Sequence, residues 1–157
     1  MYLIRAMAAA SDPALPETAI RVDRLKLAKR LWRATADDGT EFGFDLEQPV
    51  AAGDVVLATA STRYVIRQAP EAVLTIPLDP KPEASAVLGW VVGNLHFVIE
   101  ARPDRLLVPD DPALRQAFER LEIPFSASVE VFQPHRLARA VAHSHAPVSH
   151  PFIRPSR

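Results

Sequence analysis

Proline is the residue that most constrains this chain: fifteen prolines are spread through 157 residues, against only five glycines. A proline ring breaks a helix interior and removes a hydrogen-bond donor from a sheet, so each one limits the length of a neighbouring element. The sequence therefore predicts many short strands and helices with abrupt ends. Its length allows one ordinary domain or two small ones.

The composition restricts the chemistry. The absence of cysteine excludes disulfides, cysteine-based zinc sites, iron–sulfur clusters and thiol nucleophiles. Hydrophobic residues make up 48% and charged residues 24%, which is typical of a soluble globular protein. A formal net charge of −1 argues against a nucleic-acid partner. Any metal ion must be held by His, Asp, Glu or backbone atoms.

Neither a membrane span nor a secretion signal is expected. The longest apolar stretches, around residues 87–92 and 97–99, are interrupted by Gly93 and His96 and are far shorter than a spanning helix. The first ten residues contain Arg5 and are too short for the apolar part of a signal peptide. We therefore expect a cytoplasmic protein with no membrane partner.

Residues 1–70 are predicted to form a β-rich N-terminal domain. Two segments with alternating apolar residues, 31–35 and 41–46, flank the turn sequence Asp-Asp-Gly at 37–39, a pattern that predicts a hairpin. From residue 20 to about residue 77 the pattern is that of short strands punctuated by turns.

Residues 71–134 predict a different domain. The expected order is strand, helix, strand, strand, helix, strand, over residues 72–77, 83–92, 96–101, 106–108, 113–121 and 126–132. Gly93 is well placed to end the first helix, and Asp111 and Pro112 are well placed to begin the second. This βαββαβ order is the ferredoxin-like arrangement, so the predicted fold class is α+β.

Four of the five histidines lie in the last part of the chain, residues 135–157, where repeated prolines predict a flexible tail. These histidines are His135, His143, His145 and His150. His143 and His145 lie on the same side of an extended chain and could share a metal ion. The alternative is a solvated tail in which histidines cluster by chance, because a His-rich tract is only a compositional signal.

His96 is the fifth histidine and lies between a predicted helix and a predicted strand. Taken alone, it is more simply a hydrogen-bonded histidine at this junction than a metal ligand. One imidazole cannot hold a transition metal firmly, but two could do so where a two-fold axis passes beside the residue. Composition and spacing do not establish such an axis.

No template for catalysis is present. The chain lacks the glycine-rich phosphate loops, the nucleophile elbow and the zinc-protease helix motif. Asp37, Asp38, Asp110 and Asp111 lie where turns and helix caps are expected, so a structural role is sufficient for each. We therefore predict that the chain is not an enzyme.

Several short motifs resemble those of the UreE-type urease accessory proteins, from about Arg24 to the tail. The main one is Gly-Asn-Leu-His at 93–96, where that family has Gly-Asn-Arg-His. Phe-Gln-Pro at 132–134 stands where the family has Phe-Glu-Pro before a His-rich end. The turn sequences at 37–39, 53–54 and 69–71 occur in the family's order and spacing. Together they make a specific resemblance.

The resemblance implies a nickel metallochaperone that delivers Ni(II) to the urease apoprotein complex together with a GTPase accessory protein. It implies a homodimer through the C-terminal domains, with His96 of each subunit facing a shared ion. The tail histidines His135, His143, His145 and His150 would complete or extend this site, and Zn(II) or Cu(II) could compete for it. The N-terminal domain resembles a chaperone peptide-binding module and would contact protein partners.

The sequence departs from the family pattern near the expected metal site. Leu95 replaces the arginine before His96, and Val91 and residues 109–111 stand where several members have further histidines. Asp110 or Asp111 could supply oxygen ligands instead. Trp90, on the helix that leads to His96, is expected to pack in the dimer interface.

Two other functions remain open. The first is a protein-interaction adaptor in the assembly of an enzyme complex, with no role for metal. The second is RNA binding, because βαββαβ is also the RNA-recognition topology. The predicted strands 96–101 and 126–132 lack the basic and aromatic RNA-binding signature, which disfavours this second alternative.

Overall fold

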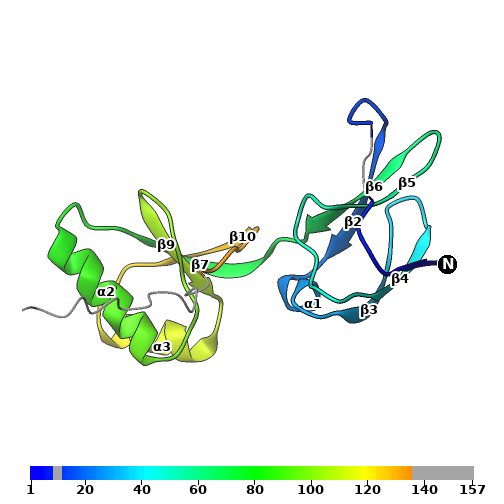
Figure 1. The fold of residues 1–157 in the computed structure, drawn as a ribbon. Helices are drawn as coiled ribbons and strands as arrows, with labels where there is room; N and C mark the ends of the chain where they lie inside the picture. The colour runs from blue at the N-terminus through cyan, green and yellow to red at the C-terminus, as the bar shows by residue number, and fades with distance from the viewer. Residues whose placement is uncertain (9–11, 136–157) are drawn as a thin grey trace, which may run out of the picture.

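The computed structural model describes residues 1–8 and 12–135. Within them the chain is mixed α+β, mostly strands with few helices, which confirms the predicted class (Figure 1). The elements are β1 (Tyr2–Ile4), β2 (Glu17–Val22), α1 (Arg24–Leu27), β3 (Leu31–Thr35), β4 (Glu41–Asp45), β5 (Val55–Ala58), β6 (Arg63–Gln68), β7 (Glu71–Pro77), α2 (Pro82–Asn94), β8 (Glu100–Ala101), β9 (Arg105–Pro109), α3 (Pro112–Arg120) and β10 (Ser126–Glu130).

Strands β1 to β6 form two small sheets, ordered β1-β4-β3 and β2-β6-β5. The predicted hairpin is confirmed: β3 and β4 are antiparallel, and Gly39 in their turn has φ +86°, a conformation that favours glycine. The strands β1 and β2 instead join their sheets by parallel pairing, β1 with β4 and β2 with β6. Buried aromatic side chains link the two sheets in one core, including Phe42, which contacts Phe44 and Tyr64.

The one-turn helix α1 interrupts the strand pattern predicted from residue 20 onward. Asp23 is its N-cap, since the Asp23 carboxylate accepts a hydrogen bond of 2.7 Å from the backbone N–H of Lys26. Leu27 is buried in the same core as β3 and β4 and so fixes the turn in place. A single helical turn is too short to show an apolar period in sequence, which explains why the pattern indicated only strands.

Strands β7 to β10 form a four-stranded sheet in the order β10-β7-β9-β8, with the chain order βαββαβ. Figure 1 shows α2 and α3 on the same side of this sheet. Alternate strand residues and one face of each helix share one buried cluster, made up of Leu74, Ile76, Leu88, Val92, Leu106, Val108, Leu114 and Phe118. The helices are therefore held by apolar burial against one sheet face.

Local signals placed the helix starts better than their ends. Asp111 caps α3 as predicted, accepting a 2.8 Å hydrogen bond from the N–H of Ala113, and Pro112 is the first helical residue. The prediction that Gly93 ends the preceding helix is wrong, because α2 continues to Asn94 and the left-handed residue beyond it is His96, with φ 61°. The strand expected over 96–101 is only the two residues of β8 for the same reason.

The other face of this sheet is crossed by a short segment, residues 131–135, which we call the strap. It begins after β10 at one sheet edge and reaches β8 at the opposite edge, where the N–H of His135 donates a 2.8 Å hydrogen bond to the carbonyl of Ile99. Phe132 is fully buried in a separate cluster with Val73 and Leu107. The predicted last strand therefore ends at Glu130, and the strap covers the sheet.

The flexible tail predicted for residues 135–157 lies outside the described residues except for His135. In the part of the chain that the structure covers, no helix has the length and apolar character needed to span a membrane.

Candidate metal centre

His96 is presented at the surface by the end of α2. Its backbone N–H bonds to the carbonyl of Gly93 at 3.0 Å, and its positive φ turns the chain away from the helix axis. A positive φ is uncommon for a residue other than glycine, although histidine adopts it more often than most. Such backbone conformations gather at functional sites, so the geometry marks His96 as a candidate.

The His96 side chain is exposed and makes no hydrogen bond to any residue that the structure describes. Within residues 1–8 and 12–135, His96 therefore has no side-chain partner that would support the simpler interpretation of a hydrogen-bonded histidine at the junction. An exposed imidazole with both ring nitrogens open to solvent can ligate a metal ion without first breaking a protein contact.

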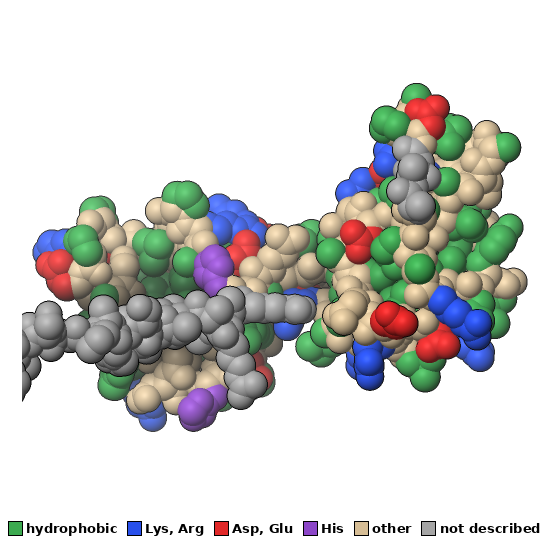
Figure 2. Space-filling view, viewed as in Figure 1, with side chains coloured by type: hydrophobic (Ala, Val, Ile, Leu, Met, Phe, Trp, Pro, Cys, Tyr) green, Lys and Arg blue, Asp and Glu red, His purple; other side chains and the backbone are tan. Residues whose placement is uncertain are grey.

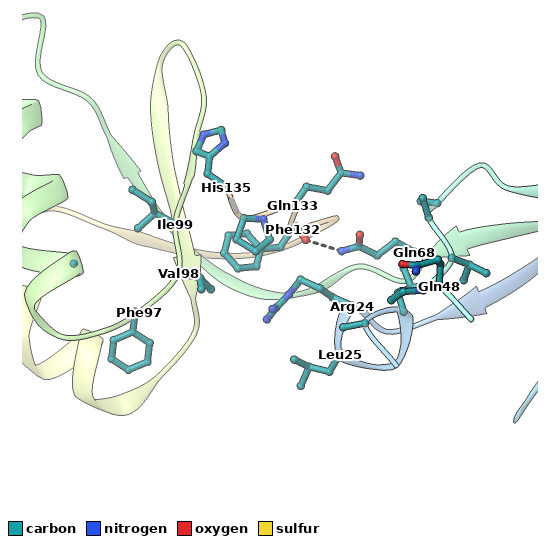
Figure 3. Close-up of a pocket in the computed structure, with 18 residues that line it drawn as sticks. Arg24, Leu25, Gln48, Gln68, Phe97, Val98, Ile99, Phe132, Gln133 and His135 are labelled. Carbon is teal, nitrogen blue, oxygen red and sulfur yellow. Dashed lines mark hydrogen bonds between the residues drawn. The ribbon is translucent and has the colours of Figure 1, made fainter. Parts of the chain in front are cut away.

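His135 has a different environment, at the end of the strap. The N–H of Ala101 donates a 3.1 Å hydrogen bond to Nε2 of His135. In a neutral imidazole that accepts at Nε2, the proton is on Nδ1, so neither nitrogen is free to bind a metal. His135 can act as a ligand only after this hydrogen bond breaks. Figure 3 shows the ring projecting from the strap, and Figure 2 shows the two described histidines apart on the surface.

The described residues do not bring a full ligand set together. Among residues 1–8 and 12–135, no group of three His, Asp or Glu side chains is placed to hold a metal ion. His143, His145 and His150 lie outside the described residues. From one chain the structure therefore offers His96 as a single open ligand.

The two aspartates considered as substitute ligands are both engaged in other contacts. Asp110 accepts two hydrogen bonds from the Arg115 guanidinium, at 2.6 and 2.7 Å, and this pairing holds the pKa of Asp110 below its ordinary value. Asp111 caps α3. Their contacts account for both residues without a metal.

An exposed apolar strip lies beside His96. It consists of Val87 and Trp90, on α2, which are 60% and 67% exposed, and Leu95, directly before the histidine, which is 37% exposed. A tryptophan left open on a helix surface is unusual unless another molecule covers it. The other tryptophan, Trp32, is buried and stacks on Phe44, as expected for a core residue.

A charged cluster joins β8, β10 and the strap near His135. The Arg102 guanidinium lies between the carboxylates of Glu100 and Glu130, with hydrogen bonds of 2.8 and 2.5 Å. Glu100 also accepts a hydrogen bond from the backbone N–H of Gln133. The hydrogen bond from Arg102, with those from Ser128 and the charge of nearby Arg105, holds the pKa of Glu130 below its ordinary value.

This lowered pKa predicts acid sensitivity. A carboxylate with a lower pKa in the folded state stabilises the fold above its unfolded pKa, and that contribution disappears as pH falls through the folded pKa. We expect the urea midpoint of the wild type to fall more steeply than that of Glu130→Gln between about pH 6 and pH 3. Glu41→Gln, an exposed carboxylate with no ion pair among the described residues, is the control. Parallel profiles for wild type and Glu130→Gln would refute the role of Glu130.

The fold and this site define a class of protein: a two-part α+β chain that presents one open histidine beside an apolar strip. Residues 71–152 match the family model described as the UreE urease accessory protein, C-terminal domain. The chain belongs to the UreE family of urease accessory proteins. Because this family consists of accessory proteins, the prediction that the chain is not an enzyme is confirmed.

Three relatives, each named urease accessory protein UreE, illustrate the similarity. The Bifidobacterium longum protein is 37% identical over 83 residues, 53% of this chain and 37% of the relative. The Ralstonia nicotianae protein is 30% identical over 115 residues, which are 72% of this chain and 54% of the relative. The Rhodobacter capsulatus protein is 31% identical over 121 residues, which are 73% of this chain and 74% of the relative. The matched region thus spans 37% and 54% of the length of the first two.

The sequence analysis singled out His96 and His135 but missed how each is held. No local signal indicates that a histidine rather than Gly93 adopts the left-handed conformation after α2. The Phe-Gln-Pro motif at 132–134 was noted only for its place before the histidines. Pro134 could have indicated that the strand ends before it, but no local signal shows that Phe132 packs over the sheet, because its partners Val73 and Leu107 are distant in sequence.

Proposed function

We propose that this protein is a nickel-binding metallochaperone that delivers Ni(II) to urease during assembly of the active site. The observation that carries the proposal is the exposed His96 imidazole, which has no hydrogen-bond partner among the described residues and lies in a chain of the UreE family. A delivery protein needs few, exchangeable and accessible ligands, and imidazole nitrogen suits nickel. The same chemistry would allow Zn(II) or Cu(II) to compete.

The metal site is proposed to form between two copies of the chain. One imidazole is too weak a site, and a two-fold axis beside His96 would place a second His96 opposite the first. The exposed strip of Val87, Trp90 and Leu95 supports this arrangement, because a second copy would bury this apolar surface on the helix that leads to the histidine. His96 would then be a ligand at the dimer interface.

The tail histidines are proposed to complete this site. The strap supports this proposal, because the N–H of His135, the first tail residue, is bonded to the carbonyl of Ile99. Ile99 is only three residues after His96 in the sequence. His143 follows His135 by eight positions in the sequence, and a fully extended chain of that length spans at most about 29 Å. His143, His145 and His150 are therefore candidate ligands, whereas His135 would first have to leave the N–H of Ala101.

The parts of the chain are proposed to have different roles. Residues 1–70 would be a peptide- or protein-binding domain, 71–134 a ferredoxin-like metal-binding and dimerisation domain, and 135–157 a flexible His-containing tail. The separate buried clusters of the two sheet regions support the first division. The urease apoprotein complex and its GTPase accessory protein are the proposed partners.

Nickel calorimetry combined with native mass determination tests this proposal. We expect about one tightly bound ion per two chains and the mass of a dimer. Trp90→Glu should give a monomer without the tight phase, because a charge in the apolar strip opposes its burial. Leu121→Glu, also exposed and apolar but on the end of α3, is the control and should behave like wild type. A tight site in the monomer, or no tight site in the wild type, would refute the shared centre.

A further inference from the structure

A groove of about 1340 Å³ lies between the two parts of the molecule. One wall comes from α1 and residues 48–52, and the other from residues 97–99 and the strap (Figure 3). We propose that this groove binds an extended, acidic and apolar segment of a partner protein. The proposal rests on the peptide-binding role proposed for residues 1–70, which supply one wall, and it does not depend on nickel.

The groove is held open by direct contacts between its walls. The Gln68 side chain donates a 2.6 Å hydrogen bond to the backbone carbonyl of Phe132, drawn in Figure 3. Arg24 of α1 makes two hydrogen bonds to Glu71, at 2.9 and 3.2 Å, and its guanidinium lies 5.2 Å from the centre of the Phe132 ring. These contacts fix the strap against the β-rich part, so the groove is formed before any ligand arrives.

The lining suits an extended peptide with apolar side chains. Leu25 and Val98 face the groove from opposite walls and are 64% and 43% exposed. The side-chain amides of Gln48 and Gln133 also line it and make no hydrogen bond to the described residues. An amide can both donate to and accept from a peptide backbone, while the apolar walls bury alternate side chains.

The charge around the groove favours an acidic ligand. Its lining contains no carboxylate. Lys26, Lys29 and Arg30, which belong to or follow α1, make no ion pair with the described residues. Of the acidic residues next to the lining or bonded to it, Glu71 and Glu100 are bound by arginines, and Asp23 caps α1. Asp23 and Glu47 make no ion pair with the described residues, so the three unpaired cations outnumber the two unpaired carboxylates. The unpaired positive charge on the α1 side would therefore attract an acidic segment.

The same charge argues against other occupants. Residues 136–157 contain four arginines and no Asp or Glu, so they would be repelled by the α1 side of the groove. Nucleic acid is disfavoured because both aromatic residues of the lining are packed in the fold: Phe132 is fully buried, and Phe97 packs against the core beneath α2. Gly93 and Phe97, on either side of His96, both line the groove, so a bound segment would lie close to the candidate metal ligand.

Fluorescence anisotropy with labelled peptides tests this proposal. The probe is a peptide of about ten residues with leucines and glutamates in a Gly-Ser background, an extended segment of the proposed kind. We expect it to bind at least about tenfold more tightly than the same peptide with lysine for glutamate or serine for leucine. Equal binding of the three peptides, or no binding below about 1 mM, would overturn the proposal. Equally tight binding of a single-stranded oligonucleotide would also overturn it.

Matched variants locate the binding site. Lys29→Glu should weaken binding of the acidic peptide by about fivefold or more, whereas Lys81→Glu, at the start of α2, should leave it unchanged. Leu25→Glu should weaken it similarly, and Leu31→Glu, exposed on β3 outside the groove lining, should not. Equal effects of each pair would place the peptide elsewhere.

His96→Asn separates this proposal from the metal function. It should keep peptide binding while losing tight nickel binding, so each proposal can fail alone.

Discussion

Replacing His96 with asparagine is expected to abolish tight nickel binding and to leave the fold unchanged. The His96 side chain is exposed and unbonded within the described residues, so its removal costs no packing. Asparagine tolerates the positive φ of this position better than alanine does, and it lacks the imidazole. If one imidazole from each chain holds the ion, the variant loses both at once. We expect the affinity measured by calorimetry to fall by at least about 100-fold.

His135→Asn is the matched control for this experiment. It removes an imidazole that is already engaged by the N–H of Ala101, so the first, tight phase of binding should persist. Thermal unfolding of both variants should resemble that of the wild type if the changes act on metal binding alone. The shared His96 site would be wrong if His96→Asn bound nickel like the wild type. Loss of the tight phase only in His135→Asn would assign the site to the tail.

Phe132→Ala is expected to cause the largest loss of stability in the second part of the chain. Phe132 is fully buried against Val73 and Leu107, and nothing else in the described residues fills that cluster. Truncating a buried phenylalanine leaves a cavity and costs about 3–5 kcal/mol. The strap would also lose its anchor on the sheet. Urea unfolding followed by amide exchange should show this loss at Leu107, within the four-stranded sheet.

Two comparisons decide what the Phe132 result means. Val129→Ala removes an exposed apolar side chain from the neighbouring strand and should cost less than about 0.5 kcal/mol. Exchange at Ile66, which lies in the separate core of the β-rich part, should change much less than exchange at Leu107. A cost below about 1 kcal/mol for Phe132→Ala would show that the strap is not a structural part of the sheet.

The features that sequence predicted are those encoded by neighbouring residues. The β3–β4 hairpin follows from one turn sequence and two alternating segments, and the start of α3 follows from Asp111 and Pro112. The βαββαβ order is likewise a succession of local patterns. The path of the strap is different, because the burial of Phe132 depends on Val73 and Leu107, which are distant in sequence.

The candidate site was predictable only in part for the same reason. His96 stood out through its motif, but its exposure and positive φ depend on α2 running past Gly93. The contact of His135 with Ala101 depends on a strap that crosses a whole sheet. The remaining ligands would come from a second copy of the chain or from residues outside the described part. A single sequence carries no geometric signal for either.

The parallel pairing of β1 and β2 has a consequence for the order of events during protein synthesis. Tyr2 pairs with Phe42, and Glu17 pairs with Arg63, so each strand leaves the ribosome well before its partner. Contacts between residues far apart in sequence form slowly, and a strand edge that is still unpaired promotes aggregation. During synthesis β1 therefore keeps an open edge until β4 is made, and β2 keeps one until β6 is made.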